Sequence, residues 1–355
     1  MDYGFVFPAA IHIHKDVTYA EQQGFTHAWL YDSQMLFSDP YASLALCAVN
    51  TNKITLGTGV TNPESRIAPV TANSIATVNE LAPGRTILGI GTGNTARRTL
   101  GMPAAKLESM REHIRICRDL FEGKTTDYTE GDRHRKIRFL NPDSDWYNIK
   151  TKIPIYIAAS GPKSLEMAGE IADGVILFGA VSPSLINFVM DHVRAGAERA
   201  GRNPQDIYAL CMTAFHLTQK GESLETSAVR QAVGPFVSSS TNIFALSNPD
   251  PKSLPADLRD DVMRFRDIYK VVEGPIETRH LKMYSDYLLG FKQEHEPIVT
   301  EKIIRATTLT GTADEIVEAI HHMKKAGIHQ VAIQPIIDNR KTVEVFSKEI
   351  IARVK

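Results

Sequence analysis

A glycine-rich segment, TILGIGTGNTARRTLG (Thr86 to Gly101), offers groups that could line a ligand. Gly91 and Gly93 allow the backbone to approach a ligand closely, and Thr92 and Asn94 carry hydrogen-bonding side chains. The segment departs from the dinucleotide-binding fingerprint, because the downstream acidic residue and a helix start at the required distance are missing. We therefore expect a ligand-lining loop here, with a simple turn that closes a barrel as the alternative.

Two histidines and an aspartate are the other side chains suited to proton transfer. His12 and His14 follow the apolar run Tyr3 to Phe7, and Asp32 follows the end of the apolar run His27 to Tyr31. Imidazole and carboxylate groups are common general acids and bases in enzymes. The alternatives are ordinary solvated loop histidines and an aspartate that caps a turn.

Eight short apolar runs predict eight β-strands that would position these groups. They lie at Tyr3 to Phe7, His27 to Tyr31, Ile54 to Thr58, Thr86 to Ile90, Ile153 to Ala159, Gly174 to Phe178, Ile207 to Leu217 and Gln330 to Pro335. Their mostly continuous apolar character is typical of parallel strands that are covered on both faces. Helical periodicity fills the intervals, with helices expected at 69–84, 105–123, 160–174 and 312–327.

This alternation predicts an α/β fold, a (β/α)8 TIM barrel, in preference to an open doubly wound sheet. The active site of such a barrel lies at the carboxyl ends of the strands. The segments that follow the predicted strands are rich in Gly, Ser, Thr and Asn. These groups suit a neutral heterocycle and a phosphate better than a metal ion, which favours clustered histidines and carboxylates.

Two insertions interrupt the expected single barrel domain, residues 1–355. Residues 124–152 are polar and turn-rich, and we expect a surface hairpin there. Residues 220–300 form a longer insertion before the last βα segment, which we expect to be a lid or a packing arm. Within it, residues 264–270 and 279–291 mix Arg, Tyr and Phe, and either a substrate pocket or an amphipathic helix that packs on the barrel accounts for them.

The composition favours a small-molecule partner. Forty basic and 41 acidic residues give a net charge of −1, without the basic excess that nucleic acids or anionic membranes favour. Cys47, Cys117 and Cys211 are far apart and sit at apolar periodic positions, so we expect packing residues rather than a disulfide or zinc site. Neither a signal peptide nor a membrane span is apparent, and the sequence predicts a cytoplasmic protein.

Two long stretches carry a family resemblance. GVTNPESRIAPVTANSIATVNELAPGRTILGIGTG, followed by PIYIAASGPKSLEMAGEIADGVI, resembles the bacterial luciferase-like oxidoreductases. That family includes FMN-dependent monooxygenases and deazaflavin-dependent enzymes such as methylenetetrahydromethanopterin reductases. The resemblance covers residues 1 to about 201, resumes near LTGTADEIVEAIHHMKKAGIHQV, and implies a TIM barrel that binds a flavin-type ring at its mouth.

The resemblance also implies cofactor-binding residues. A non-proline cis peptide is expected around Gly59 and Val60, beneath the ring, with Asn62 bonded to the pyrimidine side. The remaining implied contacts are Thr92, Gly93 and Asn94 beside the ring or ribityl chain, and Ser160, Gly161, Phe178 and Gly179 around the phosphate. The start of the helix at Ser160 suits a phosphate independently, because helix N-termini present free N–H groups to anions.

One departure concerns the proton-transfer group. Several relatives place a histidine beside the aspartate after the second strand, whereas this chain has Ser33 next to Asp32. His12 and His14 are the nearest replacements by location. The main functional hypothesis is a monooxygenase that uses reduced FMN delivered by a separate flavin reductase. The alternatives are a deazaflavin-dependent hydride-transfer enzyme and a non-catalytic flavin-binding protein, and in each case we expect a homodimer or larger oligomer.

Overall fold

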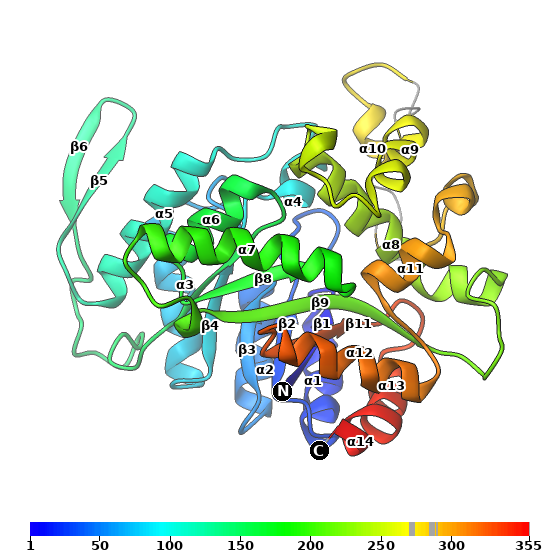
Figure 1. The fold of residues 1–355 in the computed structure, drawn as a ribbon. Coiled ribbons are helices and arrows are strands. Elements are labelled where there is room, and N and C mark those ends of the chain that lie inside the picture. Colours follow the sequence, from blue (N-terminus) through cyan, green and yellow to red (C-terminus); the bar gives the residue numbers. More distant parts are fainter. Residues whose placement is uncertain (270–273, 284–287, 289, 355) are drawn as a thin grey trace. The chain divides into compact units, whose positions relative to one another are not determined.

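The computed structural model describes residues 1–269, 274–283, 288 and 290–354 (Figure 1). The chain divides into two compact units. The N-terminal unit comprises residues 7–21 and 26–157, and the C-terminal unit comprises residues 1–6, 22–25 and 158–355. The fold class is the predicted α/β barrel with eight parallel barrel strands.

Parallel strands form the sheet of the N-terminal unit in the order β2, β3, β4, β7. These strands are His27–Leu30, Thr55–Thr58, Thr86–Ile90 and Ile155–Ala158. Position 57 of β3 must be a glycine, because an added Cβ would lie 2.4 Å from the indole Cζ3 of Trp29 on β2. The indole of Trp29 thereby fills the space that a side chain on β3 would take.

Helices of the N-terminal unit lie before β2 and after β2, β3 and β4. They are η1 (Ile11–Ile13), α1 (His14–Gln22), α2 (Pro40–Asn50), α3 (Ala68–Leu81), α4 (Asn94–Arg98) and α5 (Leu107–Phe121). The largest buried side chains of this unit include Trp29, Leu44, Leu56, Ile75 and Leu88. Residues 126–137 form an antiparallel hairpin of β5 (Thr126–Glu130) and β6 (Arg133–Ile137), labelled at the left of Figure 1.

The strands of the C-terminal unit are β1, β8, β9, β10 and β11. They span Asp2–Phe7, Gly174–Phe178, Tyr208–Leu217, Leu309–Gly311 and Gln330–Gln334. β11 pairs in parallel with both β1 and β9, and β9 also pairs with β8 and β10. All eight predicted strands are present, and β10 is an additional strand that the sequence analysis did not predict.

Two helices of this unit, α6 (Pro162–Ile171) and α7 (Pro183–Arg199), pack backbone against backbone. A Cβ at Gly196 would lie 1.9 Å from the carbonyl oxygen of Glu166, and one at Gly169 would lie 2.1 Å from that of Val193. The remaining helices outside the insertion are η2 (Pro204–Asp206), α12 (Ala313–Lys325), α13 (Asn339–Phe346), the π-helix η5 (Ser347–Ile351) and α14 (Ala352–Val354).

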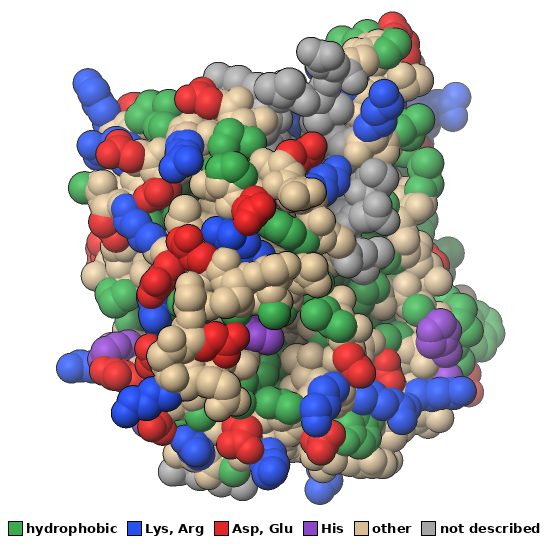
Figure 2. Space-filling view, turned by 90° about the vertical axis from the view of Figure 1, so that its right-hand side faces the viewer, with side chains coloured by type: hydrophobic (Ala, Val, Ile, Leu, Met, Phe, Trp, Pro, Cys, Tyr) green, Lys and Arg blue, Asp and Glu red, His purple; other side chains and the backbone are tan. Residues whose placement is uncertain are grey.

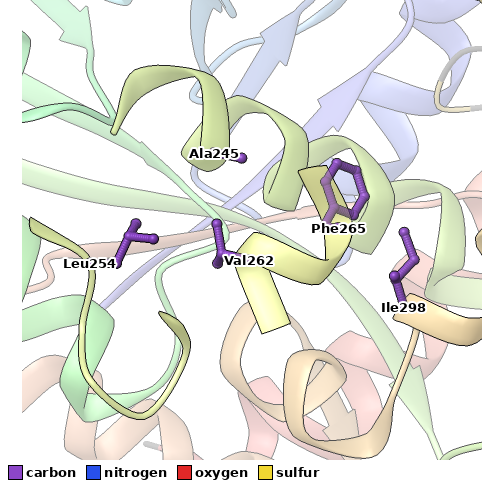
Figure 3. Close-up of a cluster of buried hydrophobic side chains, with 5 residues drawn as sticks. All are labelled: Ala245, Leu254, Val262, Phe265 and Ile298. Atoms are coloured by element: carbon purple, nitrogen blue, oxygen red, sulfur yellow. The ribbon is translucent and has the colours of Figure 1, made fainter. Parts of the chain in front are cut away.

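The insertion at 220–300 is largely helical. Its elements are α8 (Ser227–Ser247), η3 (Pro251–Ser253), α9 (Arg259–Tyr269), α10 (Arg279–Met283) and η4 (Gln293–Ile298), and α11 (Glu301–Thr307) follows. Ala245, Leu254, Val262, Phe265 and Ile298 form a buried apolar cluster that joins α8, α9 and η4 (Figure 3). Parts of the two Arg, Tyr and Phe segments, namely residues 270, 284–287 and 289, lie outside the described residues.

Surface charge agrees with the balanced composition. On the face drawn in Figure 2, Lys and Arg side chains alternate with Asp and Glu side chains across the described residues. Within the described part of the chain, no helix is long and apolar enough to cross a membrane.

Candidate functional site

A buried carboxylate lies just beyond β2, at the rim where barrel enzymes place their active sites. Asp32 is 3% exposed, and its Oδ2 accepts hydrogen bonds from Thr61 Oγ1 at 2.7 Å and Arg66 Nη1 at 2.6 Å. Thr61 and Arg66 come from the segment that follows β3, so two neighbouring strand ends build this site. We call Asp32, Asp39, Tyr41, Thr61 and Arg66 the Asp32 cluster.

The guanidinium of Arg66 is fixed by three partners. Besides Asp32, its Nη2 donates to Asp39 Oδ2 at 2.6 Å, and its Cζ lies 4.8 Å from the ring centroid of Tyr41. Asp39 is in turn the N-cap of α2, because its Oδ1 accepts the backbone N–H groups of Tyr41 and Ala42. A charged fork held on two carboxylates and one aromatic face has little rotational freedom.

Burial dominates the acidity of this cluster. It raises the pKa of Asp32 above its ordinary value, although the charge of Arg66 and the hydrogen bonds from Thr61 and Arg66 act in the opposite direction. Burial also raises the pKa of the Tyr41 phenol, which stays protonated. Both donors to Asp32 bind Oδ2, so among the described residues Oδ1 is the oxygen left to carry a proton.

The segment after β3 contains the predicted cis peptide between Gly59 and Val60. Its backbone is bonded to strands on both sides. Gly59 N–H donates to Leu30 O at 2.7 Å, and Thr61 N–H donates to Gly89 O at 2.9 Å. Gly91 N–H donates to Thr61 O at 2.9 Å, which links this segment to the glycine-rich loop.

Asn62 shapes its own loop. It is fully buried, its Oδ1 accepts the N–H groups of Glu64 and Ser65, and its Nδ2 donates to Ser65 Oγ at 2.8 Å. This is the turn chemistry expected of an asparagine before a proline. The implied contact of Asn62 with a pyrimidine ring stays a prediction.

The glycine-rich loop packs on this turn. Gly93 has a φ of +75°, and an added Cβ would lie 2.8 Å from Cβ and Cγ of Asn62. α4 begins directly afterwards, at Asn94, and Thr92 is half-buried. Asn94 Oδ1 accepts from Arg98 Nε at 2.6 Å, but its buried Nδ2 has no hydrogen-bond partner among the described residues.

The two histidines lie outside the Asp32 cluster. His12 is exposed within η1, and His14 begins α1 with its Nδ1 bonded to the carbonyl oxygen of Ile11 at 3.0 Å. No hydrogen bond joins either imidazole to the described atoms of the cluster. The structure therefore places Asp32, and neither histidine, in a buried polar environment.

The four predicted phosphate-site residues gather in the C-terminal unit. Ser160, Phe178 and Gly179 line one cavity together with residues of α8, including Ser240 and Thr241. Gly161, the N-cap of α6, lies against α8, since an added Cβ would lie 2.5 Å from the carbonyl oxygen of Ser247. At Gly179, φ is +70°, and a Cβ would lie 2.8 Å from that of Ser240.

Some polar groups around this cavity already have hydrogen-bond partners, and one does not. Ser164 Oγ accepts the N–H of Gly161 at 3.3 Å, and Gly179 N–H donates to Met212 O at 2.8 Å. Thr241 is 5% exposed, and among the described residues its buried Oγ1 has no hydrogen-bond partner. The side chain of Asn248 donates to Ser160 O at 3.1 Å.

Metal and thiol chemistry find no support in the described residues. The structure shows no group of three or more His, Cys, Asp or Glu residues there that could hold a metal ion. The three cysteines are buried, as predicted for packing residues, and burial raises the pKa of the Cys47 and Cys211 thiols to about 12.

Sequence reasoning missed four members of the cluster, Asp39, Tyr41, Thr61 and Arg66. Arg66 lies in the strand-end segment GVTNPESR, where the sequence analysis expected ligand contacts, so its position was a usable signal. Its partner could not be identified, because 34 residues separate Arg66 from Asp32. Their pairing depends on the adjacency of β2 and β3.

The chain is similar in sequence to a known family and to several characterised proteins. The family described as luciferase-like monooxygenase matches residues 12–330. A 5,10-methylenetetrahydromethanopterin reductase from Methanolobus tindarius is 31% identical, with 99% of this chain and 100% of that protein aligned. An F420-dependent glucose-6-phosphate dehydrogenase from Nakamurella multipartita is 32% identical over 47% of this chain and 50% of its own.

A solved structure has the same fold. The coenzyme F420 dependent tetrahydromethanopterin reductase of Methanopyrus kandleri superposes with a TM-score of 0.70 at 24% identity, covering 100% of this chain and 99% of its own. Because the family match extends over most of the chain, the barrel and its rim are those of a known class of oxidoreductases. The chain belongs to the luciferase-like monooxygenase family.

Proposed function

We propose that this protein transfers a hydride between the reduced deazaflavin coenzyme F420 and a small organic substrate, with a methylene-bearing tetrahydropterin as the favoured substrate. The observation that carries the proposal is the full-length similarity to a 5,10-methylenetetrahydromethanopterin reductase at 31% identity. Similarity across whole chains includes the strand-end segments, where barrel enzymes hold their chemistry.

The deazaflavin alternative is therefore better supported than the reduced-FMN monooxygenase, which was the main hypothesis from sequence. A relative that is similar over its full length is a reductase, and another that matches about half of the chain has F420 dependence in its name. Similarity of fold alone leaves the cofactor open, because one fold hosts many chemistries.

The residues of the N-terminal unit fit a flavin-type ring. Asn94 Nδ2 is a buried donor without a described partner, and such a group costs free energy unless a ligand acceptor satisfies it. A pyrimidinedione edge carries carbonyl acceptors of this kind. We assign Gly59, Val60 and the run Thr92, Gly93, Asn94 to contacts with the ring, and Asn62 to the loop that shapes them.

When bound, the reduced deazaflavin supplies a hydride. On a methylene-bridged substrate, this hydride would reduce the methylene carbon as one C–N bond of the bridge breaks, and the released nitrogen would take up a proton. Asp32 is our candidate for the group that holds this proton, because burial raises its pKa and Oδ1 is unoccupied by described donors. Arg66 and Thr61 act on Asp32 as positioning residues.

We retain the start of α6 in the C-terminal unit as the proposed anion site. Ser160 and the unpartnered Thr241 hydroxyl line the same cavity, and hydroxyl groups donate readily to phosphate oxygens. The N–H of Gly161 already donates to Ser164 Oγ. We therefore assign the anion to the hydroxyls of Ser160 and Thr241 rather than to that amide.

A titration with two cofactors tests the proposal. The purified protein is titrated with F420 and, separately, with FMN, and binding is followed by the fluorescence of each cofactor. We expect tighter binding of F420, and oxidation of reduced F420 when 5,10-methylenetetrahydromethanopterin is added. Binding of FMN alone would contradict the proposal. Binding of F420 without turnover of any substrate would favour a non-catalytic binding protein.

A matched pair of variants tests the ring contact. Asn94→Ala removes the unpartnered amide, and we expect about a tenfold loss of F420 affinity, since one hydrogen bond in a buried site is worth about 1–1.5 kcal/mol. Asn73→Ala is the control, because Asn73 is an exposed asparagine on α3 of the same unit. Equal affinities in the two variants would remove Asn94 from the site.

A further inference from the structure

Gln34, which lies two residues after Asp32, connects the segments that follow β3 and β4 in the N-terminal unit. Its Nε2 donates to the carbonyl oxygen of Ala96 in α4 at 2.5 Å, and its Oε1 accepts from Ser65 Oγ in a longer hydrogen bond of 3.4 Å. Gln34 itself belongs to the loop after β2, and β2, β3 and β4 are neighbours in the sheet. One half-buried side chain therefore joins three adjacent strand ends.

The partners of Gln34 fix the orientation of its amide group. A backbone carbonyl oxygen can only accept a hydrogen bond, so Nε2 must face Ala96 and Oε1 must face Ser65. Ser65 Oγ in turn accepts from Asn62 Nδ2 at 2.8 Å. Three hydrogen bonds thus run in one direction, from Asn62 through Ser65 and Gln34 to α4.

α4 is too short to hold its own position. A helix of five residues, Asn94–Arg98, makes few hydrogen bonds within itself and is unstable alone in water. The carbonyl oxygen of Ala96 belongs to its last turn, where backbone acceptors lack helical partners. Two side chains donate to this oxygen, Thr99 Oγ1 at 3.0 Å and Gln34 Nε2. Thr99 directly follows α4, whereas Gln34 attaches the helix to a different strand end.

The turn that carries Gln34 is strained at the next residue. Met35 has a φ of +69°, a left-handed conformation that residues with a side chain rarely adopt, and its side chain is 74% exposed. The Phe37 N–H closes the turn by donating to Ser33 O at 3.1 Å, and the Phe37 ring stacks on that of Tyr31. Because Met35 gains little burial, contacts of its neighbours must maintain this conformation, and the hydrogen bonds of Gln34 are among them.

We infer that Gln34 is a positioning residue for the flavin-type cofactor, because it holds α4 in the place from which Asn94 donates to the ring. Asn94 is the first residue of α4, and its buried Nδ2 has no hydrogen-bond partner among the described residues. Gln34 is bonded to Ala96 and Ser65, so its effect on binding passes through α4. The inference rests on the proposed function for the identity of the ligand, but not for the order of α4.

Hydrogen exchange on the protein without cofactor tests the order of α4. Gln34→Met keeps the side-chain length and removes both hydrogen bonds, whereas Gln34→Glu keeps an acceptor for Ser65 and replaces the donor to Ala96 O by an acceptor. Gln22→Met is the control, because Gln22 is an exposed glutamine at the end of α1. We expect the α4 amides to exchange about fivefold faster in both Gln34 variants, the effect of one lost hydrogen bond, and at the wild-type rate in the control.

A double-mutant cycle with Asn94→Ala tests whether Gln34 acts on the cofactor through Asn94. F420 affinity is followed by fluorescence, and urea unfolding of the same proteins measures stability separately. Gln34→Met alone should weaken F420 binding about fivefold. In the Asn94→Ala background it should have no further effect, because the group that it positions is gone. A merely structural role of Gln34 would weaken binding equally in both backgrounds.

Two outcomes would overturn the inference. One is unchanged exchange of the α4 amides in both Gln34 variants, and the other is a loss of F420 affinity on Gln34→Met that is the same with and without Asn94. A wild type that binds FMN and not F420 contradicts the proposed function instead. The cycle is then measured with FMN, whose ring has the same pyrimidinedione edge, so the two proposals fail separately.

Discussion

Replacing Arg66 by methionine isolates the physical basis of the Asp32 cluster. Asp32 is 3% exposed and the Arg66 side chain 19% exposed, so the variant leaves a buried carboxylate without its cation. Removing one member of a buried ion pair costs about 3–5 kcal/mol of unfolding free energy. Because Arg66 is partly exposed, we expect the lower end, about 3 kcal/mol at pH 8.

The stability lost in Arg66→Met must depend on pH, and the direction of this dependence follows from proton binding. Burial raises the pKa of Asp32 in the folded protein, and loss of Arg66 raises it further. Between the ordinary pKa of an aspartate and this raised value, the folded variant binds a proton that the unfolded chain lacks. Stability therefore falls as pH rises through that window, by up to about 1.4 kcal/mol per pH unit. The deficit of the variant should be largest at pH 8 and should shrink toward pH 4.

Urea unfolding followed by circular dichroism measures this deficit at several pH values. Arg199→Met is the control, because Arg199 also bonds two carboxylates, those of Glu166 and Glu170, but is 53% exposed. Exposed ion pairs contribute little to stability, so the control should lose little at any pH. Adding Asp32→Asn to Arg66→Met should restore part of the lost stability. A deficit that is independent of pH, together with a double variant no better than Arg66→Met, would refute the buried-charge explanation.

The remaining predictions concern three other positions. Gly93→Ala should weaken F420 binding and lower stability more than Gly84→Ala, because both residues have a positive φ but only a Cβ at Gly93 meets Asn62; unfolding and cofactor titrations of both variants measure this. Thr241→Val should stabilise the fold by about 1 kcal/mol, because it removes a buried hydroxyl without a described partner, while weakening binding of inorganic phosphate if that hydroxyl holds the anion. Burial lowers the pKa of His113 to about 4. The unfolded chain therefore binds the proton at a higher pH than the folded protein does. The free energy of unfolding should fall by up to about 3 kcal/mol as the pH is lowered from 6.5 to 4. His113→Leu should remove this dependence in unfolding measurements across the same range.

The barrel strands were predictable because each is a buried apolar run, and the predicted limits lie within two residues of those observed. β10 (Leu309–Gly311) was missed, because three residues with the sequence LTG carry no such run. The cis peptide between Gly59 and Val60 was expected from the family resemblance alone, and apolar patterning would not have identified it.

The candidate site was predictable by region but not by pairing. Strand ends were known to be the place to search, and Asp32 was identified there. The role of Asn62 in its own turn was readable from the following proline, yet the resemblance directed attention to a cofactor contact instead. The ion pair of Arg66 with Asp32 depends on contacts between residues far apart in sequence, and a single sequence gives no signal for it.

The proposed reaction needs a titrating group at this rim, and Asp32, which is followed by Ser33, is our candidate for it. An exposed aspartate is ionised throughout the neutral range and holds a proton poorly. Burial changes this for Asp32, since its pKa is raised even with a cation 2.6 Å away. Arg66 limits the rise, and Asp39 and Tyr41 fix Arg66, so the proton affinity of Asp32 depends on the residues packed around it. Because loss of Arg66 raises the pKa of Asp32, Arg66→Met should shift the pH profile of turnover toward higher pH. The pH range in which stability changes should shift in the same direction. A substitution that merely loosened the loop would lower turnover equally at every pH.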